Sequence, residues 1–248
     1  MSSSSPTRTI ARREWSAYFN SPVAYVFIIF FLILTGFFTF AVSRFYESNQ
    51  AELSRSFFIW HPWLYLVLVP AVGMRLWSEE RRSHTIELLL TMPVTPLQAI
   101  LGKFFAAWLF LVLALVLTFP VVWTAMYLGD PDLGVAFTGY VGSALLAGSY
   151  LSVSMLTSAL TKNQVISFII AVVLGLFLIL AGYPPVTNLL SRFLDVNIVD
   201  AIAAVSFMSH YETMQRGILD LRDIVYFASV IGFMLFGTHV VLQHKAAM

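Results

Sequence analysis

The segment 75–103 reads RLWSEERRSHTIELLLTMPVTPLQAILGK, and it separates two long apolar runs of the chain. It is charged and punctuated by prolines, within a 248-residue sequence that is 59% hydrophobic and only 11% charged. A chain of that composition has too little polar surface for a soluble globule of this size, so it belongs in a membrane. We therefore interpret 75–103 as a water-facing loop between two spans. The loop is charged but shows no catalytic group, so we interpret it as a contact surface for a partner.

Six apolar segments are long enough to cross a hydrocarbon core of about 30 Å, which takes roughly 20 helical residues. They are 23–43, 57–74, 97–128, 135–161, 163–181 and 224–242. None carries Asp, Glu, Lys or Arg in its interior, and none shows the alternating pattern of a barrel strand. The sequence therefore predicts a single all-α, polytopic membrane domain with six transmembrane helices and no soluble domain.

The distribution of charge predicts the orientation of the spans. An even number of spans places both termini on one side. With the N-terminus inside, the inner face holds nine of the 14 basic residues and only four of the 13 acidic residues. Short loops rich in Lys and Arg stay in the cytoplasm, so we expect both termini to be cytoplasmic.

Residues 7–20 precede the first span and form a predicted amphipathic helix. Ala11, Trp15, Tyr18 and Phe19 fall within an arc of roughly 100° at 3.6 residues per turn, and Arg13 lies opposite them. A basic helix with aromatic side chains on one face lies in the membrane interface. A disordered cytoplasmic tail is the alternative.

The loop itself contains local stop and start signals. A short helix over 85–91 is predicted to end before Pro93, because the residue before a proline avoids helical angles. Thr95 is then the expected N-cap of the third span, with Pro96 at the first helical position and Gln98 completing a capping box. This arrangement presents the short helix away from the bilayer.

The longest connection between spans covers 184–223. Its apolar pieces are too short to cross, so we expect short re-entrant helices in the outer leaflet, or helices that lie flat on its surface. Ser209 with Glu212 has the spacing of a capping box, Gly217 is a predicted helix stop, and Asp220 is expected to cap the sixth span. The candidate residues for an outer partner or gate are His210, Tyr211, Glu212, Arg216, Asp220, Arg222 and Asp223. Capping and anchoring of the sixth span is the alternative role for the last three.

Several kinds of chemistry find no support in the sequence. The chain has no phosphate-binding G-x-x-x-x-G-K-[ST] motif, no H-E-x-x-H, no G-x-S-x-G and no cysteine, and no basic run suggests nucleic acid. The expected absence of embedded acids and bases also disfavours ion-coupled transport. Met208, His210 and Met214 could ligate Cu(I), although packing is the favoured interpretation. We therefore expect a non-catalytic chain that binds no cofactor itself.

Parts of the loop resemble a known family. Glu79-Glu80-Arg81, the run TIELLLTMP at 85–93 and Gly102-Lys103 resemble the loop between the second and third spans of ABC-2 type permeases. The family pattern is E-[KR]-x-x-G-[ST]-x-E-x-L-L-x-x-P, followed by a basic residue near the start of the third span. His84 stands where the family usually has Gly. Residues 207–227, FMSHYETMQRGILDLRDIVYF, are similar to the gliding-motility-type branch of these bacterial permeases.

The resemblance implies a machine divided over several subunits in the bacterial inner membrane. Two permease chains, as a homodimer, would each dock an ATPase subunit that binds ATP and Mg²⁺ in place of this chain. An accessory protein with a large extracytoplasmic domain often accompanies the gliding-type branch. The residues implied in ATPase coupling are Glu79, Glu80, Arg81, Thr85, Glu87, Leu88, Leu89 and Pro93.

Two other classes of function remain open from the residues alone. An ATP-independent channel, scaffold or secondary carrier would have the same composition and the same number of spans. An intramembrane enzyme would need an embedded nucleophile with a base, and no such pair is visible. Membrane lipid surrounds the chain in every case, and a lipid or lipid-linked cargo would suit the apolar span interiors.

Overall fold

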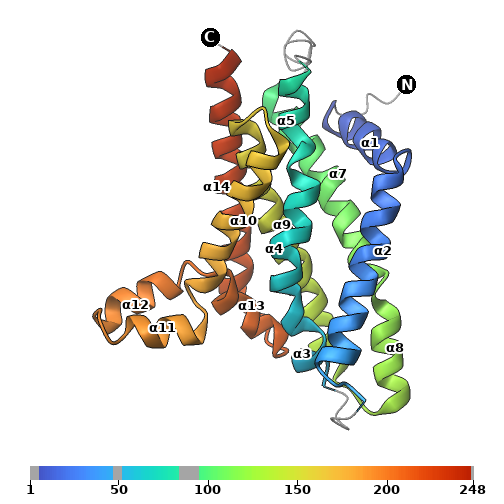
Figure 1. The fold of residues 1–248 in the computed structure, drawn as a ribbon, viewed down its shortest axis with the longest axis vertical. Coiled ribbons are helices and arrows are strands. Elements are labelled where there is room, and N and C mark those ends of the chain that lie inside the picture. The colour runs from blue at the N-terminus through green and yellow to red at the C-terminus, as the bar shows by residue number, and fades with distance from the viewer. Residues whose placement is uncertain (1–5, 47–51, 84–94, 247–248) are drawn as a thin grey trace.

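The computed structural model describes residues 6–46, 52–83 and 95–246, and all regular structure in these ranges is helical. The helices form an elongated bundle (Figure 1). The first helix, α1 (Pro6–Phe19), and the last turns of α14 (Leu221–Ala246) lie at the same end, which we call the termini end. The opposite end is called the far end, and the short helices that precede α14 lie in the half of the molecule nearest to it (Figure 1). The all-α prediction is confirmed.

Five helical runs are long and apolar enough to cross a bilayer. The first joins α2 (Pro22–Phe37) to a π-helical turn, η1 (Phe38–Val42). The second is built from α3 (Leu53–Ser56), η2 (Phe58–Trp60), α4 (His61–Gly73) and α5 (Arg75–Arg82). The others are α7 (Pro96–Val116) with α8 (Phe119–Leu128), α9 (Leu133–Leu160), and α14.

The remaining candidate span, the fifth in chain order, is a bent pair. Helix α10 (Gln164–Leu180) turns by 71° into α11 (Pro184–Leu190), at the two prolines predicted to break the fifth span. All six predicted segments are thus helical; five are candidate spans by themselves, and α10 with α11 is either a sixth, broken span or a re-entrant element. An even number of crossings agrees with the shared position of α1 and the end of α14 (Figure 1).

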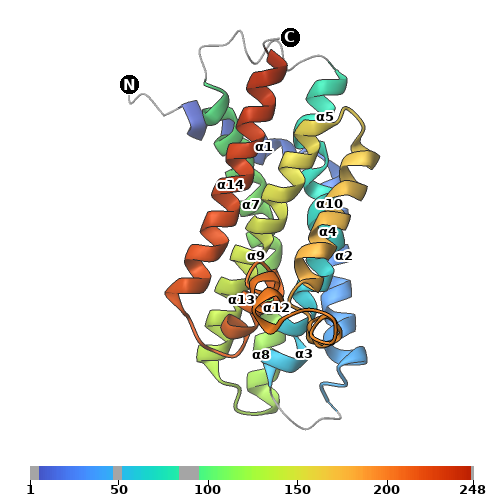
Figure 2. The same ribbon diagram turned by 90° about the vertical axis from the view of Figure 1, so that its left-hand side faces the viewer.

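Helix α9 occupies the centre of the bundle and packs against α4, α5, α7, α10, α13 and α14 (Figure 2). Its buried side chains are small or hydroxyl-bearing at many positions, which lets neighbouring helices approach closely. At Gly142, an added Cβ would lie 2.9 Å from the Cβ of Met214. Several α9 hydroxyls bond backbone carbonyls, so their burial leaves them satisfied.

The predicted N-terminal amphipathic helix is present as α1. It is separated from α2 by a turn in which the Ser21 hydroxyl accepts a hydrogen bond from the Val23 amide. Its apolar face packs on α7, where the rings of Tyr18 and Phe110 stack with their centroids 4.9 Å apart. An amphipathic helix without an apolar partner would be marginal in water, so this contact explains its place.

Two spans differ from the prediction. The second span does not end at 74 but continues as helix to Arg82, since no Gly or Pro interrupts residues 74–82. The third span breaks at Leu117 and Thr118, because Pro120 has no amide hydrogen to donate to the preceding turn. The short helix predicted over 85–91 lies outside the described residues.

The far end carries α11, α12 (Val196–Ala203) and α13 (Phe207–Gln215). The predicted capping box at Ser209 is wrong. Helix α13 begins at Phe207 with Ser206 as its N-cap, and Glu212 pairs instead with Arg216, 3.2 Å away. The stop at Gly217 is confirmed by its φ of +92°, which favours glycine. Asp220 accepts a hydrogen bond from the Arg222 amide and caps α14 as predicted.

Candidate functional site

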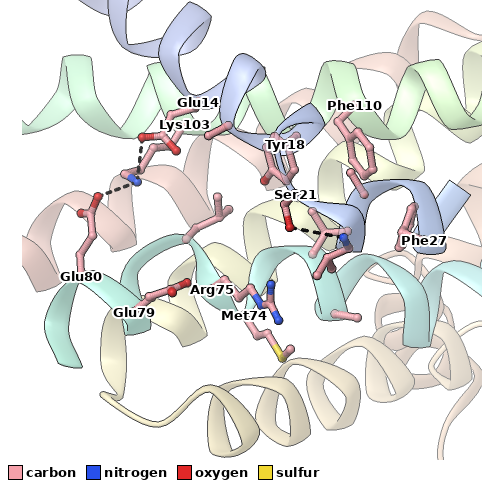
Figure 3. A pocket seen from close by; sticks show the side chains of 16 residues that line it. Glu14, Tyr18, Ser21, Phe27, Met74, Arg75, Glu79, Glu80, Lys103 and Phe110 are labelled. Carbon is pink, nitrogen blue, oxygen red and sulfur yellow. Dashed lines mark hydrogen bonds and ion pairs between the residues drawn. The ribbon is translucent and has the colours of Figure 1, made fainter. Parts of the chain in front are cut away.

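A buried lysine joins three helices at the termini end. Lys103 lies two turns inside α7, and only 4% of its side chain is exposed. Its Nζ is 2.8 Å from Oε1 of Glu80 on α5 and 3.3 Å from Oε1 of Glu14 on α1 (Figure 3). The same nitrogen lies 5.4 Å from the centroid of the Trp77 ring, within cation–π range. We call Glu14, Trp77, Glu80 and Lys103 the Lys103 cluster.

Nearby cations favour the charged form of the Glu14 carboxylate. Burial alone would raise the pKa of Glu14, but Lys103 and Arg13 outweigh burial and hold that pKa below its ordinary value. The Arg13 guanidinium donates a hydrogen bond to Glu14 over 2.9 Å, and that contact raises the pKa of Arg13. A buried ammonium is stable only with such partners, so α1, α5 and α7 are bound together through one charge.

Helix α5 is also fastened to α9. The Ser158 hydroxyl accepts hydrogen bonds from the amides of Trp77 and Ser78, at 3.1 and 3.0 Å. It also donates to the Met74 carbonyl over 2.8 Å. A side chain inserted into a helical ladder is a recognised cause of a kink, and here it marks the junction of α4 and α5. One turn further on, Arg81 donates to the Ala159 carbonyl over 2.6 Å, where a cation suits the C-terminus of α9.

A second buried polar group ties the far end to α14. Nδ1 of His210 lies 2.6 Å from Oδ1 of Asp223, and its Nε2 lies 3.1 Å from the Ala204 carbonyl. The other carboxylate oxygen of Asp223 accepts a hydrogen bond from Thr213. The His210 ring stacks on Tyr226, with centroids 3.8 Å apart. These contacts join the end of α12, helix α13 and the first turn of α14.

Comparison with known proteins agrees with this architecture. Residues 46–237 match the family model described as ABC-2 family transporter protein. The chain belongs to the ABC-2 family. It is the multi-span membrane permease domain of such a transporter, and members of the family generally work with an ATPase partner. No curated protein matches the chain.

The permease brings part of the predicted coupling set into the network just described. Glu80 lies in the Lys103 cluster, Arg81 contacts α9, and Glu79 is exposed one residue away on α5. Thr85, Glu87, Leu88, Leu89 and Pro93 lie outside the described residues. The capping box predicted where the loop enters α7 is confirmed, since Thr95 and Gln98 exchange hydrogen bonds of 3.3 and 3.1 Å.

Lys103 and Glu14 were not predicted as site residues, and the prediction that the span interiors lack charge is wrong at Lys103. A signal was available: Lys103 is the one basic residue within the predicted span 97–128. A lysine there must either reach the interface or find a carboxylate. The carboxylates belong to Glu14 and Glu80, and no local sequence pattern connects these two residues to Lys103.

The far-end candidates of the permease divide into two groups. His210, Tyr211 and Asp223 are buried, and the Tyr211 hydroxyl bonds Ser143 and the Phe58 carbonyl. Arg216, Asp220 and Arg222 are exposed, and Glu212 is partly exposed. Both ring nitrogens of His210 have partners, and Met208 and Met214 are buried in the packing. Among the described residues, no group of three or more His, Cys, Asp or Glu side chains is placed to hold a metal ion.

The His210–Asp223 contact leads to a testable expectation. Replacing Asp223 with Asn should lower the free energy of unfolding by about 1–3 kcal/mol, because a buried charge-assisted hydrogen bond is lost. Thermal unfolding of the purified permease in detergent measures this loss. Asp220→Asn is the matched control, since Asn caps a helix as well as Asp does. Equal melting temperatures for the two variants would show that the contact contributes nothing.

Proposed function

We propose that this permease receives the motion of a separate ATPase through the loop 83–95 and passes it to the membrane bundle through the Lys103 cluster. The observation that carries the proposal is the position of that cluster. It joins α5, which enters the loop, to α7, which leaves it, and both to α1. A force applied to the loop would therefore act on one bonded unit.

The contacts of α5 with α9 provide the next step. Because Ser158 and Arg81 bond α5 to the end of α9, displacement of α5 must move or strain the central helix. Packed interiors respond to such displacement by rigid shifts, since they deform little. In this proposal α9 carries the shift toward α13 and α14 at the far end, and a cargo or a partner's motion follows.

The full assembly is proposed from the family resemblance. Two ATPase subunits, each holding ATP and Mg²⁺, would act on two copies of the permease. Residues 207–227 support a place in the gliding-motility-type branch, with an accessory extracytoplasmic protein at the far end. The exposed side chains of Arg216 and Arg222 support that surface as its contact.

The orientation that fits this proposal has the termini end in the cytoplasm of a bacterial cell, with the permease in the inner membrane. The excess of basic residues at that end supports it. Because the native chain has no cysteine, Ser83→Cys introduces a single reporter thiol. We expect a membrane-impermeant maleimide to label it in inverted vesicles and not in intact cells. Asp130→Cys should give the reverse pattern, and labelling of Ser83→Cys from outside would reject the orientation.

Co-purification tests the function itself. The full-length permease, isolated from its own membrane in mild detergent, should retain a P-loop ATPase in a stoichiometric ratio. Transport or mechanical output in proteoliposomes should then require ATP. A permease that moves solute as efficiently without any ATPase would favour the alternative class of channel or secondary carrier.

A further inference from the structure

A pocket of about 450 Å³ lies at the termini end, between α1, α2, α4, α5 and α7. Its wall along α4 and α5 changes from apolar to charged between Ala71 and Glu79, a distance of roughly 12 Å at 1.5 Å per helical residue. Ala71 and Val72 line one end of this wall, whereas Glu79 and Glu80 line the other. The charged end is the end that leads into the loop 83–95.

The other walls change in the same direction. Glu14 on α1 faces the charged end, and Phe27 on α2 faces the apolar end (Figure 3). On α7 the order is Lys103 and then Phe110. Three independent walls therefore share one polarity gradient, parallel to the helices that cross the bilayer. A cavity of this kind matches an amphiphile, with its head toward water and its tail toward lipid.

The charges that line the pocket restrict the headgroup. Lys103 is held by Glu14 and Glu80, whereas Arg75 and Glu79 are exposed one turn apart on α5. Within the described ranges, neither of these two side chains forms an ion pair. Three carboxylates and two cations give the lining a net charge of −1, which disfavours a net anionic headgroup. An anionic and a cationic group side by side in the ligand would match Arg75 and Glu79.

We propose that this pocket binds a zwitterionic phospholipid with a primary amine headgroup, from the leaflet at the termini end. The phosphate pairs with Arg75, and the ammonium donates hydrogen bonds to Glu79. A primary ammonium has three donor hydrogens, whereas a quaternary choline has none, so the site selects the amine. The acyl chains leave along Phe27 toward the exposed apolar face of α2, which includes Val26 and Phe30. All residues of this lipid site belong to the permease, so binding does not depend on ATPase coupling.

Native mass spectrometry of the full-length permease tests the proposal. The protein is released from micelles doped with equal amounts of dioleoyl phosphatidylethanolamine, phosphatidylcholine and phosphatidylglycerol. We expect preferential retention of phosphatidylethanolamine. Arg75→Gln and Glu79→Gln should each weaken it by about tenfold or more, the loss expected for one charge-assisted hydrogen bond. Arg82→Gln, on the same helix but outside the pocket, should leave retention unchanged.

Three results would overturn the proposal. Equal retention of the three lipids would remove the headgroup selectivity, and preference for phosphatidylglycerol that depends on Arg75 alone would show a simple anion site. A lipid-free dimer that dissociates in Arg75→Gln would show that a second copy occupies the pocket.

Ala71→Phe fills the apolar end and should reduce retention of phosphatidylethanolamine without touching a charge. If Arg75→Gln fails to fold, Ala71→Phe and the wild-type selectivity decide the matter, with no ATPase present.

Discussion

Replacing Lys103 with Met is expected to lower the free energy of unfolding by about 2–4 kcal/mol, because it removes the buried ammonium that pairs with the partly buried carboxylates of Glu14 and Glu80. Glu14 retains Arg13, but Glu80 loses its 2.8 Å contact with the ammonium. Thermal unfolding in detergent measures the effect. Lys162→Met is the control: Lys162 is exposed at the same end, so its loss should change the free energy of unfolding by less than about 0.5 kcal/mol.

A triple variant separates stability from function. Glu14→Gln, Glu80→Gln and Lys103→Met together remove the three charges of the cluster, so much of the lost stability should return. If the cluster couples loop to bundle, ATP-driven output should remain impaired in this stable variant. A triple variant with full output would show that the cluster is only structural. Wild-type stability in the single variant Lys103→Met would contradict the burial argument itself.

The pH dependence of stability provides another readout of the same cluster. Because the pKa of Glu14 is lowered in the folded state, its stabilising contribution is present above the unfolded pKa. That contribution is lost as the pH falls through the lowered folded value. The difference between wild type and Glu14→Gln should therefore be constant near neutral pH and shrink only in acid. A difference that disappeared between pH 6 and 8 would assign the effect to another group.

The spans and the Thr95 cap could be predicted because their signals are local. Long apolar runs leave a helix as the only structure that satisfies its own backbone in lipid, and the cap needs only residues 95–98. The predicted start of α13 was wrong because Ser206 and Ser209 are both acceptable N-caps. Tertiary packing favours Ser206, because its hydroxyl also donates a hydrogen bond to the Ile179 carbonyl over 3.2 Å. No sequence pattern near Ser206 contains that partner.

The candidate site was predicted only in part for the same reason. Glu80 and Arg81 were found through a loop motif, whereas Glu14 and Lys103 act through contacts between distant positions. The burial of Lys103 depends on carboxylates from α1 and α5. The polarity gradient of the pocket likewise needs three helices in register. Such features arise when the bundle assembles, so they are visible in the structure and not in the composition.

The second large effect is expected at the loop. Replacing Leu88 and Leu89 with Ser should abolish stable association with the ATPase while the permease remains inserted. The two leucines follow Glu87 between α5 and α7, and these helices hold both ends of the loop at the termini end. The sequence predicts a water-facing loop here, and adjacent leucines in such a loop are apolar anchors that a groove on a partner accepts. Loss of two such anchors typically costs several kcal/mol of binding, a factor of more than about a hundred in affinity.

Co-purification in detergent reads this out, with Leu97→Ser as the matched control. Leu97 is an exposed leucine in the first turn of α7, just after the loop, and its replacement should leave the complex intact. The melting temperature of the isolated Leu88→Ser, Leu89→Ser permease should equal that of wild type, because the described bonds of the Lys103 cluster and of Ser158 hold the helices on both sides of the loop together. Retention of the ATPase at wild-type ratio would exclude these leucines as its anchor. Joint loss of the ATPase and of thermal stability would instead place them in the packing of the permease itself.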